Sequence, residues 1–340
     1  MAADARPQPP APDERRYADA LNDALERLAG HGPQWGPGFA FHAPMAAEAI
    51  AALGYYDEIP GWIERNRTKR QYSDQPAELH PIDPADPGEQ KAALGDYRRV
   101  ADWGRLFDRE LALRPWREVL LEWWPRLLPG LTGALGHGLI RTAHAVRGLG
   151  IVTDPGPAQL GELAQGLAFW AASYNTPPGR TLPAQLPALT DPLPHEARQA
   201  LVTAAGAAAG LLADGSPRPA VPLVHMVTIP MAVDLVMPHL PADLHPDAYR
   251  YGMRASGEVL RWFGSHLRPA AGAGPGAGPD TSVPTVIASV ESAMDTEDEH
   301  AIKLADVCVR SAALHADNEP YARAVGMLVT LLRRGQAIPG

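Results

Sequence analysis

The residues of this sequence best suited to chemistry are an imidazole and an amine that lie three positions apart, His300 and Lys303. Residues 296–310 carry acidic side chains at their start and contain no Gly or Pro, so the sequence predicts a helix there. With about 3.6 residues per turn, both side chains share a face of that helix with Leu304 and Val307. An imidazole and an amine are therefore expected on an inward-facing, apolar side.

Lys303 has two possible roles. Burial disfavours the charged form of a lysine and lowers its pKa, and an amine without its proton is a nucleophile or the precursor of a metal ligand. Alternatively, the side chain of Lys303 reaches solvent beside Arg310, as lysines on helices commonly do. The periodicity of the helix leaves both readings open.

Five of the twelve histidines lie in apolar segments spread along the whole chain: His42, His137, His144, His225 and His300. Each one alone could be a hydrogen-bonded histidine of the core. Five buried imidazoles, however, carry many polar nitrogens that need partners, and convergence on one metal ion would satisfy several at once. Cys308 is the single cysteine, which excludes thiolate-rich sites and an internal disulfide and leaves imidazole and carboxylate ligands.

The elements that must position these residues are predicted to be helices, and the fold class is all-α. We expect one large multi-helix domain over residues 14–340, a flexible tail over 1–13, and Pro/Gly-rich connections that include a flexible loop over 269–279. Persistent alternation typical of strands is missing from the sequence. Helices are predicted at residues 14–29, 44–53, 59–69, 89–113, 115–124, 131–149, 160–174, 194–213, 245–267, 296–310 and 321–332.

Composition excludes several classes of function. The chain has 340 residues, of which 46% are hydrophobic, so a sizeable core is expected. A net charge of −9 without a basic cluster argues against nucleic-acid binding. The start of the chain resembles no signal peptide, and the Ala-rich run 200–213 is too short to span a membrane, so we expect a soluble, cytoplasmic protein. The Ala-rich helices could support a homodimer.

Motifs of other enzyme classes are absent from the sequence or out of place. The glycines around Gly272 match the letter of a dinucleotide-binding fingerprint but lie in a Pro-rich loop with no strand before them. The sequence contains no P-loop, no Gly-x-Ser-x-Gly and no His-Glu-x-x-His.

Four segments in order resemble the questin oxidase family: residues 39–45 (FAFHAPM), 137–140 (HGLI), 223–228 (LVHMVT) and 298–303 (DEHAIK). The resemblance extends from about residue 21 to residue 310. It implies an all-helical oxygenase that uses O2 to open the ring of an anthraquinone or a related aromatic polyketide by oxidative C–C cleavage. It also implies a non-haem Fe(II) ion held by His42, His137, His225 and His300, with Lys303 carboxylated to a carbamate ligand. Whether NADPH is consumed is left open.

The sequence departs from the family pattern at Arg141, where fungal members tend to carry a second histidine. His144 lies one turn further on and could contact a ligand, act as a base facing the substrate, or replace a ligand. Arg141 could bind a phenolate or carboxylate of the substrate, or it could be a solvated helix arginine. The alternative function is a helical protein that binds a small molecule on the same scaffold without turning it over.

Overall fold

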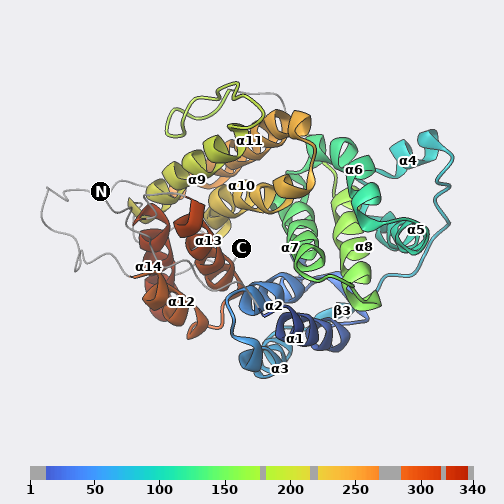
Figure 1. Cartoon of the computed structure of the whole chain (residues 1–340), viewed down its shortest axis with the longest axis horizontal. Coiled ribbons are helices and arrows are strands. Elements are labelled where there is room, and N and C mark those ends of the chain that lie inside the picture. Colours follow the sequence, from blue (N-terminus) through green and yellow to red (C-terminus); the bar gives the residue numbers. More distant parts are fainter. Residues whose placement is uncertain (1–12, 177–180, 215–220, 268–284, 315–318, 336–340) are drawn as a thin grey trace, which may run out of the picture.

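The computed structural model describes residues 13–176, 181–214, 221–267, 285–314 and 319–335, and the expected tail and the expected loop at 269–279 fall almost entirely outside them. The described chain forms a mostly all-α single domain, as predicted (Figure 1). Its helices are α1 (Glu14–Arg27), α2 (Ala43–Ala52), α3 (Ile59–Lys69), α4 (Pro87–Ala93), α5 (Val100–Leu113), α6 (Trp116–Leu127), α7 (His137–Ile151), α8 (Pro157–Ala172), α9 (Ala197–Asp214), α10 (His225–Val236), α11 (His245–Phe263), α12 (Val286–Met294), α13 (Glu299–Leu314) and α14 (Glu319–Arg333).

The helices surround a central group that carries the histidines. Figure 1 shows α7 and α10 in the middle of the molecule, with α2 below them and α13 beside them. Helix α8 packs along α7 on one side, α9 and α11 cover α10, and α14 covers α13. This arrangement buries α2, α7, α10 and α13 on most sides, so polar residues on them must find partners inside the protein.

A small antiparallel sheet was not predicted. Strands β1 (His31–Trp35), β2 (Phe39–Ala40) and β3 (Tyr72–Asp74) pair in the order β2-β1-β3. Gly36 and Gly38 have positive φ angles in the turn between β1 and β2. β2 and β3 have only two and three residues, and β1 contains Gly32 and Pro33, which is why the sequence pattern missed them. The sheet leads the chain directly into α2.

Two predicted helices are interrupted. The helix expected at 89–113 is broken into α4 and α5, and Gly95 between them adopts a left-handed φ of 78°. The helix expected at 131–149 begins only at His137, after a tight turn over Gly133–Gly136. In that turn Ala134 and Leu135 have φ values of 45° and 57°, a conformation that costs L-residues free energy. The break therefore lies directly before a candidate ligand.

The apolar core contains one stretch that is long and apolar enough to cross a membrane, Val221–His239. It is a longer apolar run than residues 200–213, and within the described fold 94% of it is buried. That burial is what the core helix of a soluble protein shows, and the stretch includes α10 with Pro230 in its interior.

Candidate metal centre

Four helices begin at one point in the core, and each brings a histidine there. His137 and His225 are the first residues of α7 and α10, and His300 is the second residue of α13. His42 directly precedes α2 at its N-cap position, and its side chain makes no capping hydrogen bond. All four histidines are buried, with at most 8% of the residue exposed. The sequence prediction that these side chains lie in the interior is confirmed.

The four imidazoles form a closed ring of contacts. The ring centroids lie 4.6 Å apart for His42 and His137, 4.5 Å for His137 and His225, 5.5 Å for His225 and His300, and 4.6 Å for His300 and His42. One ring nitrogen from each of His42, His137 and His300 lies within 4.8 Å of the other two. Residues from four distant segments of the chain thus meet around one small volume.

Nitrogen atoms of these rings face one another at distances that suit a shared ion. The Nε2 atoms of His42 and His137 are 2.7 Å apart, and those of His137 and His225 are 3.0 Å apart. Two nitrogens bound about 2.1 Å from one ion at right angles to each other would be separated by roughly 3.0 Å. The donor set therefore fits a transition metal that prefers imidazole.

The turns that precede the ligand helices orient two of the rings. The Nδ1 atom of His137 donates to the carbonyl oxygen of Ala134, in the left-handed turn, and Nδ1 of His225 donates to the carbonyl oxygen of Pro222 at 3.0 Å. A hydrogen bond at Nδ1 fixes the tautomer that leaves a lone pair on Nε2. Both Nε2 atoms consequently point into the cluster as acceptors.

Burial keeps the rings of His42, His137 and His225 neutral. It lowers the pKa of His42 and of His137 well below the usual value, and the nearby charge of Lys303 lowers both further. Burial also lowers the pKa of His225, and the neighbouring rings of His137 and His300 add to the effect. A neutral imidazole has a free lone pair, which is the form that binds metals.

Lys303 lies among these histidines with its amine unpaired. Only 2% of the residue is exposed, and Nζ has no hydrogen-bond partner among the described residues. The alternative in which Lys303 reaches solvent beside Arg310 is therefore wrong. Burial lowers the pKa of Lys303 to about 8, although the charges of Glu299 and Asp298 oppose this shift. At neutral pH about a tenth of the molecules would carry a neutral amine.

The electrostatics of the cluster favour an anionic ligand. Four helix N-termini point at it, and each contributes partial positive charge. A divalent ion would add two more charges, while neutral imidazoles bring none. The nearest carboxylates, Asp298 and Glu299, each have an oxygen within 4.8 Å of a ring nitrogen of His300, with Asp298 3.6 Å from its Nδ1, and both already have partners. Asp298 accepts the backbone N–H groups of His300 and Ala301, and Glu299 is bound by Arg70 at 2.7 and 3.0 Å and by Asn66 at 2.7 Å.

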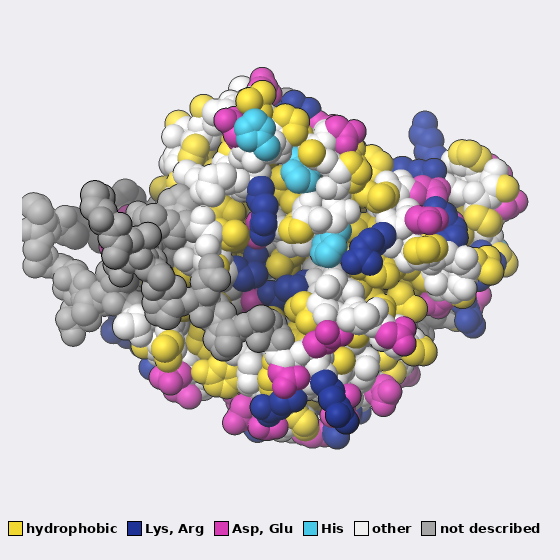
Figure 2. Space-filling model, viewed as in Figure 1, with side chains coloured by type: hydrophobic (Ala, Val, Ile, Leu, Met, Phe, Trp, Pro, Cys, Tyr) yellow, Lys and Arg dark blue, Asp and Glu magenta, His cyan; other side chains and the backbone are white. Residues whose placement is uncertain are grey.

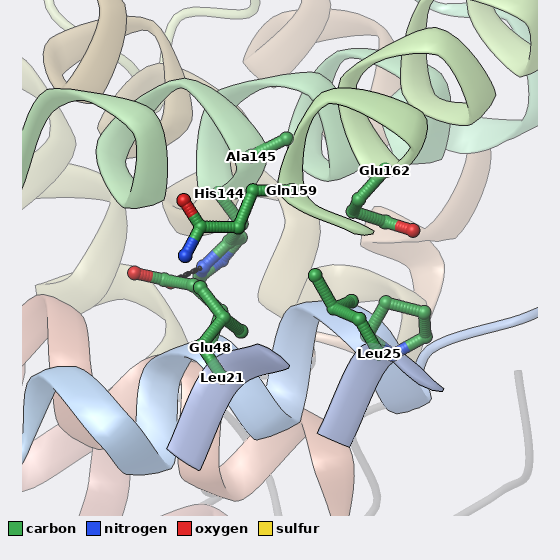
Figure 3. A pocket seen from close by; sticks show the side chains of 8 residues that line it. Leu21, Leu25, Glu48, His144, Ala145, Gln159 and Glu162 are labelled. Atoms are coloured by element: carbon green, nitrogen blue, oxygen red, sulfur yellow. Dashed lines mark hydrogen bonds and ion pairs between the residues drawn. The ribbon is translucent and has the colours of Figure 1, made fainter. Parts of the chain in front are cut away.

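A second buried polar layer lies further along the same helices. His144, two turns after His137 on α7, donates from Nδ1 to Glu48 of α2, and Figure 3 shows this pair beneath the side-chain amide of Gln159. Tyr17 and Arg147 also donate to Glu48. The pair borders a cavity of about 10 Å³, room for about one water molecule, with both amide atoms of Gln159 unpaired beside it within the described part of the chain. His144 is thus placed outside the ring of four, about 10 Å along α7 from His137.

The polar layer continues as a chain of ion pairs from the core toward the surface. Arg147 pairs with Glu48 and with Asp306 of α13 at 2.7 Å, and Arg310 pairs with Asp306 and Asp234 at 3.1 Å. Each of the four helices carries at least one member: Glu48 on α2, Arg147 on α7, Asp234 on α10, and both Asp306 and Arg310 on α13. This series of ion pairs connects the four helices below the level of the histidines. The sequence analysis missed it, although acidic and basic residues inside apolar helices were a visible signal.

Arg141 does not face the cluster as a free cation. Its guanidinium makes two hydrogen bonds to Glu162 of α8, at 2.6 and 2.7 Å, and lies 5.6 Å from the ring of Phe41. Only 3% of the residue is exposed, so the solvated-arginine alternative is wrong. Nη1 has no hydrogen-bond partner in the described structure. A role for Arg141 in binding substrate stays a prediction.

Comparison with known proteins adds no assignment. No protein-family model matches this sequence, and no curated protein is detectably similar to it.

Proposed function

We propose that this protein is a metal-dependent oxygenase with non-haem iron held by His42, His137, His225 and His300. The observation that carries the proposal is the unpaired amine of Lys303 beside four imidazoles, among which the Nε2 atoms of His42, His137 and His225 face one another across the described core. Packing alone gives no reason to bury a partnerless lysine among neutral histidines, because such burial costs several kcal/mol. A metal ion bound by the histidines and by an anionic form of Lys303 would give the imidazole nitrogens and the lysine nitrogen the partners they lack.

Lys303 would supply that ligand as a carbamate. The neutral amine attacks CO2, a C–N bond forms, and the proton that the nitrogen loses leaves to solvent. The product carries one negative charge and two oxygen atoms near the helix N-termini, where anions are stabilised. A lowered pKa makes the amine available for this reaction near neutral pH.

The substrate class is proposed to be an anthraquinone or related aromatic polyketide, with O2 as the second substrate. This rests on the resemblance to the questin oxidase family, supported by the aromatic hairpin that leads into His42. In this hairpin the rings of Trp35 and Phe39 are 5.1 Å apart, and both residues are part-exposed. Iron, when bound, would supply the activation of O2 for ring cleavage. The chain itself orients the ligands and keeps the site dry.

His144 is proposed to act as a base close to the site. Glu48 holds its Nδ1, which leaves Nε2 as the atom that can take a proton. Burial lowers the pKa of His144, while the hydrogen bond and charge of Glu48 oppose that shift. We further propose that the protein works in the cytoplasm, where its one cysteine, Cys308, stays buried and reduced.

Metal content tests the proposal. Protein made without a His tag in iron-supplemented medium is expected to hold one iron per chain by elemental analysis, and to consume O2 with anthraquinone substrates. Iron-free protein that still binds such compounds without turnover would support the alternative, a helical binding protein. One equivalent of zinc or manganese per chain would support the metal site and contradict its assignment to iron.

The carbamate has its own test, because the sequence contains only three lysines, Lys69, Lys91 and Lys303. Zinc-loaded protein equilibrated with 13C-bicarbonate should show one carbamate carbonyl signal by NMR. The signal should disappear in Lys303→Ala and persist in Lys91→Ala, whose lysine is exposed on α4. If the wild-type protein gave no such signal, the carbamate would be contradicted, and the proposed metal site formed by the histidines would be unaffected.

A further inference from the structure

A second cavity lies at the opposite ends of the ligand helices. It has a volume of about 360 Å³ and is bordered by residues from the C-terminal ends of α7, α10 and α13. The charged residues in its wall are Arg147, Arg198, Arg310 and Asp234, with His239 beside them. Figure 2 shows arginine or lysine side chains gathered near the centre of one face of the molecule.

The cavity is lined by three arginines and one aspartate, while the other carboxylates that pair with these arginines lie behind them. Asp234 is shared by Arg198 at 2.7 Å and Arg310 at 3.1 Å, and Asp306 lies beneath Arg310 and Arg147. With Glu48, which pairs with Arg147 from the other side, the buried network contains three guanidinium groups and three carboxylates. Arg117 stands over the ring of Trp116, which contacts His239, and adds a further positive charge at the rim.

Donors at the cavity remain available. Arg198 uses Nε for Asp234, and its Nη1 and Nη2 have no partner among the described residues. Arg310 likewise keeps Nη2 free of any described partner. The side chain of Arg198 is 40% exposed, whereas both aspartates are nearly fully buried. The acids therefore hold the arginines in place, and guanidinium N–H groups are left for a ligand.

The cavity is distinct from the histidine cluster. On α7 the first residue, His137, belongs to the cluster and the last two, Gly150 and Ile151, border the cavity. On α13 His300 stands at the start and Leu314 at the end. At about 1.5 Å per residue, some 14 residues separate the two sites by roughly 20 Å.

We propose that this cavity is a binding site for a small dianionic molecule that carries either a phosphate group or two carboxylates. Arg198 and Arg310 would bind the oxyanion through their free N–H groups, because a guanidinium presents paired donors that match two oxygens of such a group. The cavity volume suits a ligand of metabolite size. This site is independent of the metal proposed above.

Calorimetric titration of the full-length protein with inorganic phosphate and, separately, with succinate tests the proposal at fixed ionic strength. At least one anion should bind saturably with one site per chain, and the one that binds identifies a phosphate or carboxylate ligand. Arg198→Gln should weaken binding about tenfold, the loss of one charge-assisted contact. Arg310 still pairs with Asp234 in this variant, so the fold should persist.

Two control variants distinguish anion binding in this cavity from a general charge effect and from binding at a metal. Arg250 has a side chain 39% exposed and also pairs with two aspartates, so Arg250→Gln is a matched control that should bind as the wild type does. His137→Ala tests whether the anion binds at a metal instead, and should leave the affinity unchanged. Linear, unsaturable titrations with both anions would overturn the proposal. Equal weakening by Arg198→Gln and Arg250→Gln, or loss of binding in His137→Ala, would do the same.

Discussion

The Nε2 atoms of His42 and His137 lie 2.7 Å apart, although 95 positions separate these residues in the chain. Two ring nitrogens at this distance need either a proton or an ion between them. A neutral His42 can supply a proton to Nε2 of His137, but this atom also faces Nε2 of His225 at 3.0 Å, and both of those rings donate through Nδ1 and leave Nε2 as an acceptor. An ion shared with His225 and His300 satisfies all of these constraints together.

Removal of one imidazole should therefore release the metal and lower stability. His137→Ala is expected to lose bound iron, because the ring lies between His42 and His225. A ligand present at 100 times its dissociation constant stabilises the folded state by about 2.7 kcal/mol, so metal-loaded wild type should lose this amount on chelation while the variant should not. Elemental analysis and thermal unfolding with and without EDTA measure both effects.

The matched control is His195→Ala, since the side chain of His195 is 76% exposed and borders a different pocket, beside Tyr249. It should retain metal and the response to EDTA. Equal metal content in the two variants would contradict the assignment of His137.

Lys303→Met should produce opposite effects on stability and on metal binding. In metal-free protein the variant should be more stable by about 3 kcal/mol at pH 7, because the pKa of Lys303 falls from 10.5 to about 8 on folding and each unit corresponds to about 1.4 kcal/mol. The unfolded chain holds the proton more tightly, so wild-type stability should rise between pH 8 and 10.5. Urea unfolding at several pH values measures this.

In the metal-loaded state the comparison should reverse, with Lys303→Met binding iron more weakly. A variant that is destabilised in both states would show that the amine has an ordinary structural role.

Much of this site was predictable from the sequence because its residues carry their own signals. His300 and Lys303 share a helix face with Leu304, and His225 stands in an apolar segment, so their burial could be predicted from periodicity. The pairing of Glu48 with His144 could not, because it depends on how α2 and α7 lie against each other. Likewise, the short pairing of β1 with β2 is set by a turn and leaves no alternation to read.

Glu48 should make the protein sensitive to acid. Burial alone would raise the pKa of Glu48, but the charge of Arg147 and the hydrogen bond from His144 outweigh it and lower the pKa to about 2. A carboxyl with a folded-state pKa below its unfolded value of 4.5 contributes stability that is complete above pH 4.5 and is lost as the pH falls toward 2. The contribution is about 3 kcal/mol.

Glu48→Gln should abolish that acid-dependent component and destabilise the protein by about 3–5 kcal/mol at pH 7, because Arg147 loses a buried partner. The exposed Glu26 provides the control, and Glu26→Gln should follow the wild-type curve. Parallel pH profiles for wild type and Glu48→Gln would rule out the contribution assigned to Glu48.

The left-handed turn before α7 should store strain that glycine relieves. Ala134 has a φ of 45°, and its carbonyl oxygen accepts the hydrogen bond that orients His137. A left-handed conformation costs an L-residue about 1–2 kcal/mol, whereas glycine adopts it freely but loses about 0.5–1 kcal/mol more entropy on folding. Ala134→Gly should therefore stabilise the protein by up to about 1 kcal/mol in urea unfolding and leave metal content unchanged. The same replacement inside α7, Ala145→Gly, should instead destabilise by about 1 kcal/mol, since that position is helical. If both variants lost stability equally, the turn would be unstrained, and its geometry would reflect only the packing of His137.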